Sequence, residues 1–363
     1  MNILKKILTI SLIAVLSISQ TACSINPNSQ NVGYTKESFY FDTICDITLY
    51  GMAGLSDEYD DEEFKSKIIS ECFERCVDYE NMLSKTKENS DIMKINNGGN
   101  SWTIVNEHTA YLIEKSLKYS ELSNGIFDIS IGKASELWDF HREESEGKLP
   151  DKEELAQAVN HIDYTKIVCD APNHEVKLLD PEMEIDLGGI AKGYIADEVS
   201  SLLRDWGVTS AVINFGGNIV AIGGKANKFA DEEASYEDFK IGIRNPLSES
   251  GELLGYIPGK NITVVTSGTY ERYIEVDGVK YHHVLNPKTG YPFETDLIQV
   301  SIVMDEGMSA DADAISTTCL ALGRDEGIKY IEKLSRDMNI EAIFLDNDGN
   351  IICTNENSKF VEN

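Results

Sequence analysis

Long apolar runs, positive charge and paired cysteines are all scarce in this chain of 363 residues. The apolar run at residues 7–18 is too short to span a bilayer. The 32 basic residues are outnumbered by 62 acidic ones, and the formal charge of -30 argues against sequence-independent binding to a phosphate backbone. Any anionic ligand must therefore be held by local positive charge. Acidity of this kind is also the usual signature of a soluble surface.

Regular cysteine spacing and several widespread motifs are missing as well. The seven cysteines include no CxxC pair, and their scattered positions argue against a disulfide framework. Cys72 and Cys76 share one face of an expected helix, where core packing is favoured over metal binding because no further ligands accompany them. Walker, GxGxxG and G-x-S-x-G spacings are absent, so neither a common nucleotide fingerprint nor serine hydrolase chemistry is indicated.

What the chain does contain is a composition typical of a globular protein, with 42% hydrophobic and 9% aromatic residues. Residues 1–22 resemble a signal peptide, with two lysines before the apolar run. Thr21-Ala22-Cys23 resembles a lipobox, which predicts lipidation of Cys23; cleavage by an ordinary signal peptidase is the alternative. Residues 23–36 are then a lipid-anchored flexible tether. We therefore expect a protein anchored by lipid to the extracytoplasmic face of the cell membrane.

Hydrophobic periodicity beyond residue 36 predicts helices and strands that are interspersed rather than strictly alternating. An acidic surface insertion is expected at residues 225–238. The pattern predicts an α+β fold, a single compact unit at 37–363 in one or two lobes with mostly antiparallel strands. Helices are expected at 64–83, 107–122 behind the N-cap Asn106, 151–161, 188–206, 311–322 and 325–337. Strands are expected at 39–50, 166–169, 175–179, 184–187, 210–214, 219–222, 273–276, 279–283, 342–345 and 351–354.

Residues 281–292 (YHHVLNPKTGYP) combine two adjacent histidines with residues that make a loop rigid. Pro287 and Pro292 fix φ, and Gly290 permits a left-handed or closely approached backbone. The histidines are thus held beside a rigid loop, and such loops often carry functional residues. A functional site and a hairpin end whose histidines cap the strands both fit this pattern.

Three further segments contain residues suited to phosphate or metal chemistry. In residues 185–194 (IDLGGIAKGY) two glycines open a helix, where free N–H groups favour an anion; a tight strand-to-helix turn is the alternative. In residues 310–318 (ADADAISTT), Asp313 and Thr317 lie on one helix face and offer hard oxygen donors suited to Mg²⁺. Asp near a helix start also stabilises the helix dipole. Residues 265–272 (VTSGTYER) follow a strand and could form a second phosphate-facing turn.

Taken together, these segments resemble the ApbE family, the FAD:protein FMN transferases. The resemblance runs from about Phe39 to the expected hairpin near the C-terminus. Six segments resemble the family's motifs in the family's order: T-x-G-x-F-D at 123–129, D-L-G-G-I-A-K-G-Y-x-x-D at 186–197, N-x-G-G-D/N at 213–218, T-S-G at 266–268, H-I-x-D-P-x-T-G at 283–290 and A-D-A-x-x-T at 312–317.

The resemblance implies a fold of the ApbE type and an Mg²⁺-dependent transfer of FMN from FAD to a threonine hydroxyl of an exported acceptor protein, with release of AMP. Exported electron-transfer flavoproteins are the implied acceptors. The implied metal ligands are Asp313, Thr317 and the carbonyl of Gly189, and His283 is implied as the base or as the group that positions the threonine. The implied FAD-binding residues are Phe41, Thr86, Ile126, Phe127, Asp128, Asp186, Lys192, Arg244, Ser267 and Val284.

Elementary chemistry agrees with this reaction, because phosphoryl transfer needs charge neutralisation and in-line positioning more than covalent help. In a chain this acidic, the metal together with local cations must supply the positive field. The candidates for those cations are Lys192, Arg244, Arg272 and Lys288.

Three positions depart from the family pattern. Phe41-Asp42-Thr43 replaces M-G-T, Asn286 stands where Asp is usual, and Thr86 sits where an aromatic residue often covers the nucleotide. A more open pocket at Thr86 would let water compete, so an Mg²⁺-dependent FAD pyrophosphatase that gives FMN and AMP is the nearest alternative. A non-catalytic FAD-binding lipoprotein is a further one. His283 and the metal ligands count against it, because storage needs no base beside the pyrophosphate.

Overall fold

The computed structural model describes residues 33–52, 62–140, 148–227, 235–248 and 250–363. All of these residues belong to one unit, Gly33–Asn363. The expected signal peptide and Cys23 lie outside the described residues, as does most of the expected tether. None of the helices within the described ranges is long and apolar enough to cross a membrane.

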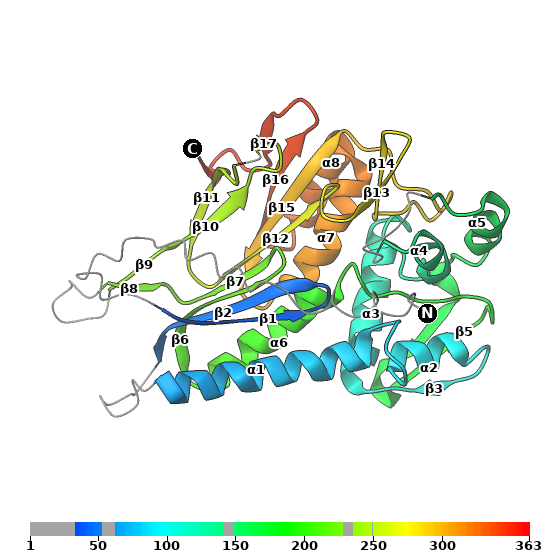
Figure 1. Ribbon diagram of the computed structural model, residues 1–363, viewed down its shortest axis with the longest axis horizontal. Coiled ribbons are helices and arrows are strands. Elements are labelled where there is room, and N and C mark those ends of the chain that lie inside the picture. Colours follow the sequence, from blue (N-terminus) through cyan, green and yellow to red (C-terminus); the bar gives the residue numbers. More distant parts are fainter. Residues whose placement is uncertain (1–32, 53–61, 141–147, 228–234, 249) are drawn as a thin grey trace, which may run out of the picture. The chain divides into compact units, whose positions relative to one another are not determined.

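A sheet of eight strands forms the centre of the unit (Figure 1). Each strand in it pairs antiparallel with its neighbours. Side chains alternate between the two faces, so that Val264 and Val265 of one strand enter different cores. The strands, in spatial order, are β1 (Tyr34–Tyr40), β2 (Thr43–Met52), β6 (Val208–Phe215), β7 (Asn218–Ile222), β12 (Ile262–Gly268), β15 (Leu297–Asp305), β16 (Ile340–Asp346) and β17 (Ile351–Cys353).

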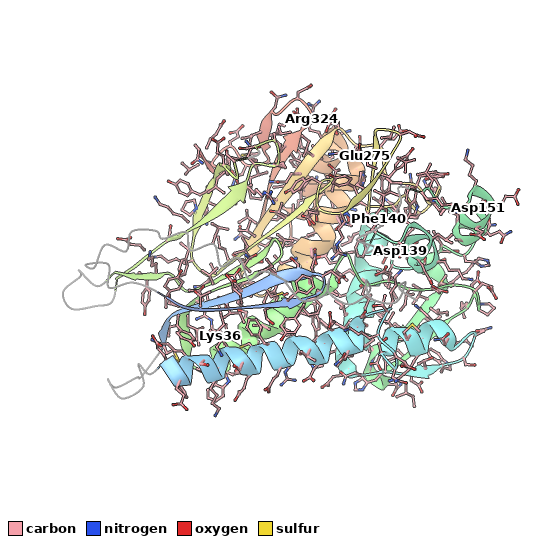
Figure 2. All side chains as sticks on the ribbon, in the orientation of Figure 1. Lys36, Asp139, Phe140, Asp151, Glu275 and Arg324 are labelled. Atoms are coloured by element: carbon pink, nitrogen blue, oxygen red, sulfur yellow. The ribbon has the colours of Figure 1, made fainter. Side chains whose placement is uncertain are left out.

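Different layers cover the two faces of this sheet. One face packs against helices α1 (Glu62–Leu83), α6 (Ala191–Asp205), α7 (Ser309–Leu322) and α8 (Arg324–Leu334), which share the larger core. Lys36 of β1 reaches α1 (Figure 2), where its Nζ donates to the Ser66 carbonyl at 3.2 Å. The other face packs against a three-stranded sheet of β10 (Phe239–Arg244), β11 (Leu253–Gly259) and β18 (Val361–Glu362).

The remaining elements form smaller groups around these layers (Figure 1). Helices α4 and α5 pack with the β13–β14 hairpin in a third core around Trp138. The elements are α2 (Asp91–Asn97), α3 (Glu107–Leu122), α4 (Gly132–Trp138), α5 (Lys152–Val159), the sheet of β3 (Thr103–Ile104), β5 (Glu175–Leu178) and β4 (Ile167–Asp170), and the pairs β13 (Tyr273–Val276) with β14 (Val279–His282) and β8 (Lys225–Asn227) with β9 (Ser235–Glu237).

Local signals in the sequence predicted several of these elements well. Asn106 caps α3 through its side chain, and the Asp151 carboxylate accepts two backbone N–H groups at the start of α5. Helix α6 stops just before Gly207, whose φ is 79°. The β13–β14 hairpin turns at Asp277-Gly278 as predicted. The α+β class and the mostly antiparallel strands are confirmed, and residues 33–363 form a single unit.

Other predictions were wrong. The single strand expected at 39–50 is two strands, β1 and β2, because Phe41 and Asp42 reverse the chain with φ of 53° and 57°. The strand expected at 184–187 is an extended segment with one isolated bridge, between Glu184 and Ile131. The insertion expected at 225–238 stays a prediction, because residues 228–234 lie outside the described residues; the strands β8 and β9 pair on either side of them. Elements α2, α4, β10, β11 and β15 were not predicted.

Candidate active site

One large cavity brings the predicted site residues together. Its volume is about 1040 Å³, which suits a small-molecule ligand or cofactor. It is lined by the β1–β2 turn, the segment after α1, the loops before α4 and α6, the end of β12 and part of α7. The residues predicted for FAD, metal and base all line it: Phe41, Thr86, Ile126, Phe127, Asp128, Asp186, Gly189, Lys192, Arg244, Ser267, His283, Val284, Asp313 and Thr317. Their individual roles stay predictions.

The start of α6 and the first turns of α7 meet at Asp313. This buried carboxylate accepts a hydrogen bond from the Gly193 backbone N–H at 3.0 Å and pairs with the Lys192 ammonium at 3.5 Å. Gly193 is the third residue of α6, so its N–H is one of the groups at a helix start that have no partner within the helix, and Asp313 satisfies it. The carbonyl of Gly189 lies just before the helix and, among the described residues, accepts no backbone hydrogen bond, so it is available to a ligand.

Thr317 lies one turn further along α7. Its hydroxyl, like the Gly189 carbonyl, is available to bind a ligand. The hydroxyls of its neighbours Ser316 and Thr318 bond back to helix carbonyls at 2.9 and 2.7 Å, whereas within the described residues the Thr317 hydroxyl has no hydrogen bond. A Cβ placed on Gly189 would lie 3.8 Å from this hydroxyl oxygen. One carboxylate, one hydroxyl and one carbonyl therefore converge, and these hard oxygens fit Mg²⁺ that shares further ligands with a phosphate.

Few of the donors at this candidate metal site are the side chains that most often bind metals. The described ranges contain no group of three or more His, Cys, Asp or Glu side chains able to hold a metal ion. Only Asp313 of the three candidate ligands belongs to those residue types.

Asp186 lines the cavity beside Lys85, which the sequence did not single out. Its carboxylate lies 3.3 Å from the Lys85 ammonium and accepts from Ser135 Oγ at 2.8 Å and from Gly188 N–H at 2.9 Å. Burial acts to raise the pKa of Asp186, but the Lys85 charge and these hydrogen bonds outweigh it and hold the pKa below its ordinary value. Lys85 has no distinctive sequence signal, because only the fold brings it to Asp186.

Asp128 lines the cavity while bonding to the surrounding backbone. One carboxylate oxygen accepts from the N–H and the hydroxyl of Ser130 at 2.8 and 2.6 Å, and the other accepts from Tyr164 N–H at 3.1 Å. Burial raises the pKa of Asp128, although these hydrogen bonds oppose the shift. Through these hydrogen bonds the Asp128 carboxylate stabilises the cavity wall.

The two adjacent histidines have different surroundings. His282 is buried, its Nε2 lies 2.9 Å from the Phe293 carbonyl, and its Nδ1 accepts from Val284 N–H at 3.3 Å, so its ring is fully used by the fold. His283 lines the cavity. Its Nδ1 lies 3.2 Å from the carbonyl oxygen of Arg272, which can only accept, so Nδ1 carries the proton and Nε2 keeps a lone pair. Phe140, beside the β13–β14 hairpin (Figure 2), places its ring centroid 6.4 Å from that of His283.

The charge state of His283 gives a prediction about pH. Burial and the Arg272 and Lys192 cations lower the pKa of His283 to about 3, below its ordinary value near 6.5. Between these values the unfolded chain binds a proton that the folded protein does not, so this site costs stability as pH falls from 6.5 towards 3. We expect His283→Gln to be less destabilising at pH 5 than at pH 7.5 in urea unfolding. A larger destabilisation at pH 5 would contradict the lowered pKa.

The β1–β2 turn is fixed to the cavity wall by two residues that sequence reasoning did not connect with it. The Phe41 N–H donates to Glu80 at 3.1 Å, and the Arg272 guanidinium donates to the Phe41 carbonyl at 3.1 Å. Arg272 also lies 3.9 Å from Asp42. Since the Arg272 carbonyl accepts from both the backbone N–H and the ring of His283, one residue connects the turn with the histidine.

Cations gather on the cavity wall although the chain as a whole is acidic. Lys85, Lys192, Arg244 and Arg272 all line the cavity. Arg244 is exposed and, among the described residues, has neither an ion pair nor a hydrogen bond. Lys288 is exposed and is not part of the wall, although its contribution to the positive field was expected. Carboxylates line the cavity as well, so positive charge is available at particular points, such as Lys192 and Arg244, rather than over the whole wall.

Glu271 lines the same wall, where its side chain is exposed, and had no sequence signal. The surrounding protein displaces part of the water around its carboxyl group and raises its pKa to about 7, although Lys192 and Arg272 act in the opposite direction. Perturbed carboxyl groups of this kind are common in functional clefts.

Comparisons with known proteins agree with this geometry. The family model described as the ApbE family matches residues 41–344. An FAD:protein FMN transferase of Treponema pallidum is 30% identical over 318 residues, which cover 86% of this chain and 84% of that protein. An FAD:protein FMN transferase of Klebsiella pneumoniae is 31% identical and covers 79% of this chain and 84% of its own length.

Solved structures give the same result. The ApbE protein of Thermotoga maritima superimposes with a TM-score of 0.75 at 30% identity, covering 88% of this chain and 96% of that one. The flavin transferase ApbE from Vibrio cholerae has a TM-score of 0.74 at 20% identity, covering 91% and 100%, and shares the fold. These matches place the chain among enzymes of the transferase class. It belongs to the ApbE family.

Proposed function

We propose that this protein transfers FMN from FAD to a threonine hydroxyl of an exported acceptor protein in an Mg²⁺-dependent reaction. The threonine oxygen attacks the FMN-side phosphorus, the anhydride bond to the AMP phosphate breaks, and AMP leaves. The main support is that the oxygen donors of α6 and α7, the cations Lys192 and Arg244, and His283 all line one cavity. The names of the relatives at 30% and 31% identity support flavin as the transferred group.

Asp313, Thr317 and the Gly189 carbonyl would hold the Mg²⁺ ion. When bound, the ion would neutralise charge on the pyrophosphate oxygens. Lys192 lies beside Asp313 and can contribute positive charge at the same place. These groups act through charge and position, which phosphoryl transfer chiefly requires.

His283 would accept the proton of the threonine hydroxyl at Nε2. The Arg272 carbonyl fixes its ring and tautomer. The pKa near 3 is too low for an efficient base at neutral pH, but the negative charges of a bound pyrophosphate act to raise it. Substrate binding would therefore increase the basicity of His283.

The direct test is to incubate the protein with FAD, Mg²⁺ and the apo form of an exported flavoprotein that carries FMN on a threonine. The mass of the acceptor and the amount of AMP are measured together. A flavinylated acceptor with stoichiometric AMP is the expected result. FMN and AMP without labelling would indicate a pyrophosphatase instead, and intact bound FAD would indicate a carrier.

Hydrolysis of FAD is the second candidate because Thr86 is exposed on the cavity wall. Its hydroxyl lies 3.0 Å from Ser84 Oγ, and it offers no ring to cover a nucleotide. We expect Thr86→Tyr to lower AMP release from FAD in the absence of acceptor several-fold, because an aromatic ring would exclude water. Thr86→Val is the matched control, since it removes the hydroxyl without adding a ring. Equal rates of AMP release by the wild type and both variants would show that Thr86 does not control the access of water.

We also propose that the protein is anchored to the membrane through lipid on Cys23 and acts on the extracytoplasmic side. The support is the signal-peptide pattern of residues 1–22 and the lipobox-like residues before Cys23. We expect Cys23→Ala to move the protein from the membrane fraction to the soluble fraction, with activity per folded molecule unchanged. Retention of this variant in the membrane fraction would exclude the anchor.

A further inference from the structure

The tip of the β1–β2 hairpin carries two exposed apolar side chains directly opposite each other. Phe39 and Ile44 are partners across the two strands and are 65% and 62% exposed. Among the large hydrophobic residues in the described ranges, only Ile104 is more exposed. We call Phe39 and Ile44 the hairpin-tip patch.

The next positions along this hairpin face are polar. The next cross-strand pairs on the same face are Glu37 with Asp46 and then Thr35 with Thr48. The apolar surface is therefore confined to the end of the hairpin that carries the turn. Two adjacent exposed apolar side chains offer a small contact surface to a partner.

The hairpin-tip patch is continuous with the candidate active site. Ile44 lines the cavity, and Phe41, Asp42 and Thr43 of the same turn line it too. Phe39 is not part of the cavity wall, so a ligand enclosed by the cavity leaves its side chain uncovered. The patch thus extends from the cavity wall to the outer surface of the enzyme.

The patch also has a fixed position relative to His283. Glu80 and Arg272 hold the turn from its two sides through Phe41, and the Arg272 carbonyl holds the histidine ring. Strand β1 is the outermost strand of the eight-stranded sheet. A polypeptide bound to this end of the hairpin would therefore have a fixed position relative to His283, which would receive the threonine proton.

We infer that the hairpin-tip patch docks the acceptor protein. The occupant is an extended acceptor segment, and an apolar side chain next to its threonine covers Phe39 and Ile44. The inference rests on the proposed function and adds how the enzyme selects its protein substrate. The small apolar area suits a transient enzyme–substrate contact, in which a few anchoring side chains supply most of the affinity.

The test is Phe39→Thr, which removes the ring but keeps a residue suited to a strand. We expect KM for the apo flavoprotein acceptor to rise about tenfold, the loss expected of one anchoring side chain. The affinity for FAD, measured by quenching of flavin fluorescence, and the rate of AMP release without acceptor should not change. Ile104→Thr is the matched control, because Ile104 is 74% exposed on β3 and does not line the cavity, and its KM should equal that of the wild type.

Each other outcome would overturn the inference for a different reason. An unchanged KM would mean that the acceptor docks elsewhere, and weaker FAD binding by Phe39→Thr would assign the patch to the flavin site. A wild-type dimer that Phe39→Thr converts to a monomer in light scattering would mean that a second copy covers the patch. Absence of acceptor labelling by the wild-type protein would refute the proposed function itself, and the docking surface with it.

Discussion

Asp313→Asn is expected to slow AMP release from FAD by about 1000-fold while the protein stays folded. The asparagine can still accept the hydrogen bond from Gly193 N–H, so the contact between α6 and α7 remains. It cannot supply the negative charge that a divalent cation needs at this place. Loss of metal-assisted charge stabilisation costs several kcal/mol, and about 4 kcal/mol corresponds to a factor of about 1000.

The measurement is single-turnover AMP release, followed at several Mg²⁺ concentrations, together with thermal unfolding of each variant. Asp325→Asn is the matched control, because this aspartate of α8 is exposed, with 75% of its side chain accessible, and is absent from the cavity wall. The control should keep the wild-type rate. Undiminished AMP release by Asp313→Asn would show that Asp313 is not a metal ligand. If Asp313→Asn does not fold, Thr317→Val tests the same site, because it leaves the Asp313 carboxylate in place.

Gly193→Ala is expected to destabilise the protein by about 3 kcal/mol, the opposite of the usual effect in a helix. An alanine in a helix interior normally favours the fold by about 1 kcal/mol relative to glycine. Here a Cβ would overlap the Ser309 carbonyl oxygen, lie 2.6 Å from its carbonyl carbon and lie 2.9 Å from the Ala310 Cα. These are backbone atoms at the start of α7, so they cannot rotate away as a side chain would.

The free energy of unfolding in urea measures this effect. Gly51→Ala on β2 is the control, since its nearest neighbours would be 3.4 Å away and the change should cost little. Because α6 and α7 also carry Lys192 and Asp313, Gly193→Ala should lower AMP release in the fraction that remains folded. A stabilised Gly193→Ala protein would show that the two helices are not in close contact at this point.

The sequence predicted the elements that local chemistry determines. Asn106 and Asp151 are side-chain caps, and Gly207 and Gly278 adopt positive φ, so each acts within a few residues of its own position. The site residues could be predicted for a related reason, since they occur in short motifs that supply the ends of elements. The fold then brings those ends to one cavity.

What the sequence could not predict depends on contacts between distant segments. Strand β15 is buried almost throughout, including its polar residues Gln299 and Ser301, so it lacks the exposed polar face that usually marks a strand. The turn at Phe41 and Asp42 lacks the glycine or asparagine that usually marks positive φ. The contacts of Lys85, Glu80 and the Arg272 guanidinium form only when the fold brings in partners that lie 39 to more than 100 positions away in the sequence.

The β1–β2 turn at Phe41 and Asp42 lowers the stability of the fold but fixes the position of the hairpin tip. Left-handed φ values at two residues with a Cβ cost roughly 1 to 2 kcal/mol each, and the bonds from Glu80 and Arg272 offset part of this strain. Asp42→Gly would relax the backbone, yet it would also make this part of the cavity wall less rigid. Heat tolerance and catalytic alignment therefore place opposite demands on this hairpin, and a thermostable form of the enzyme is better sought elsewhere in the chain.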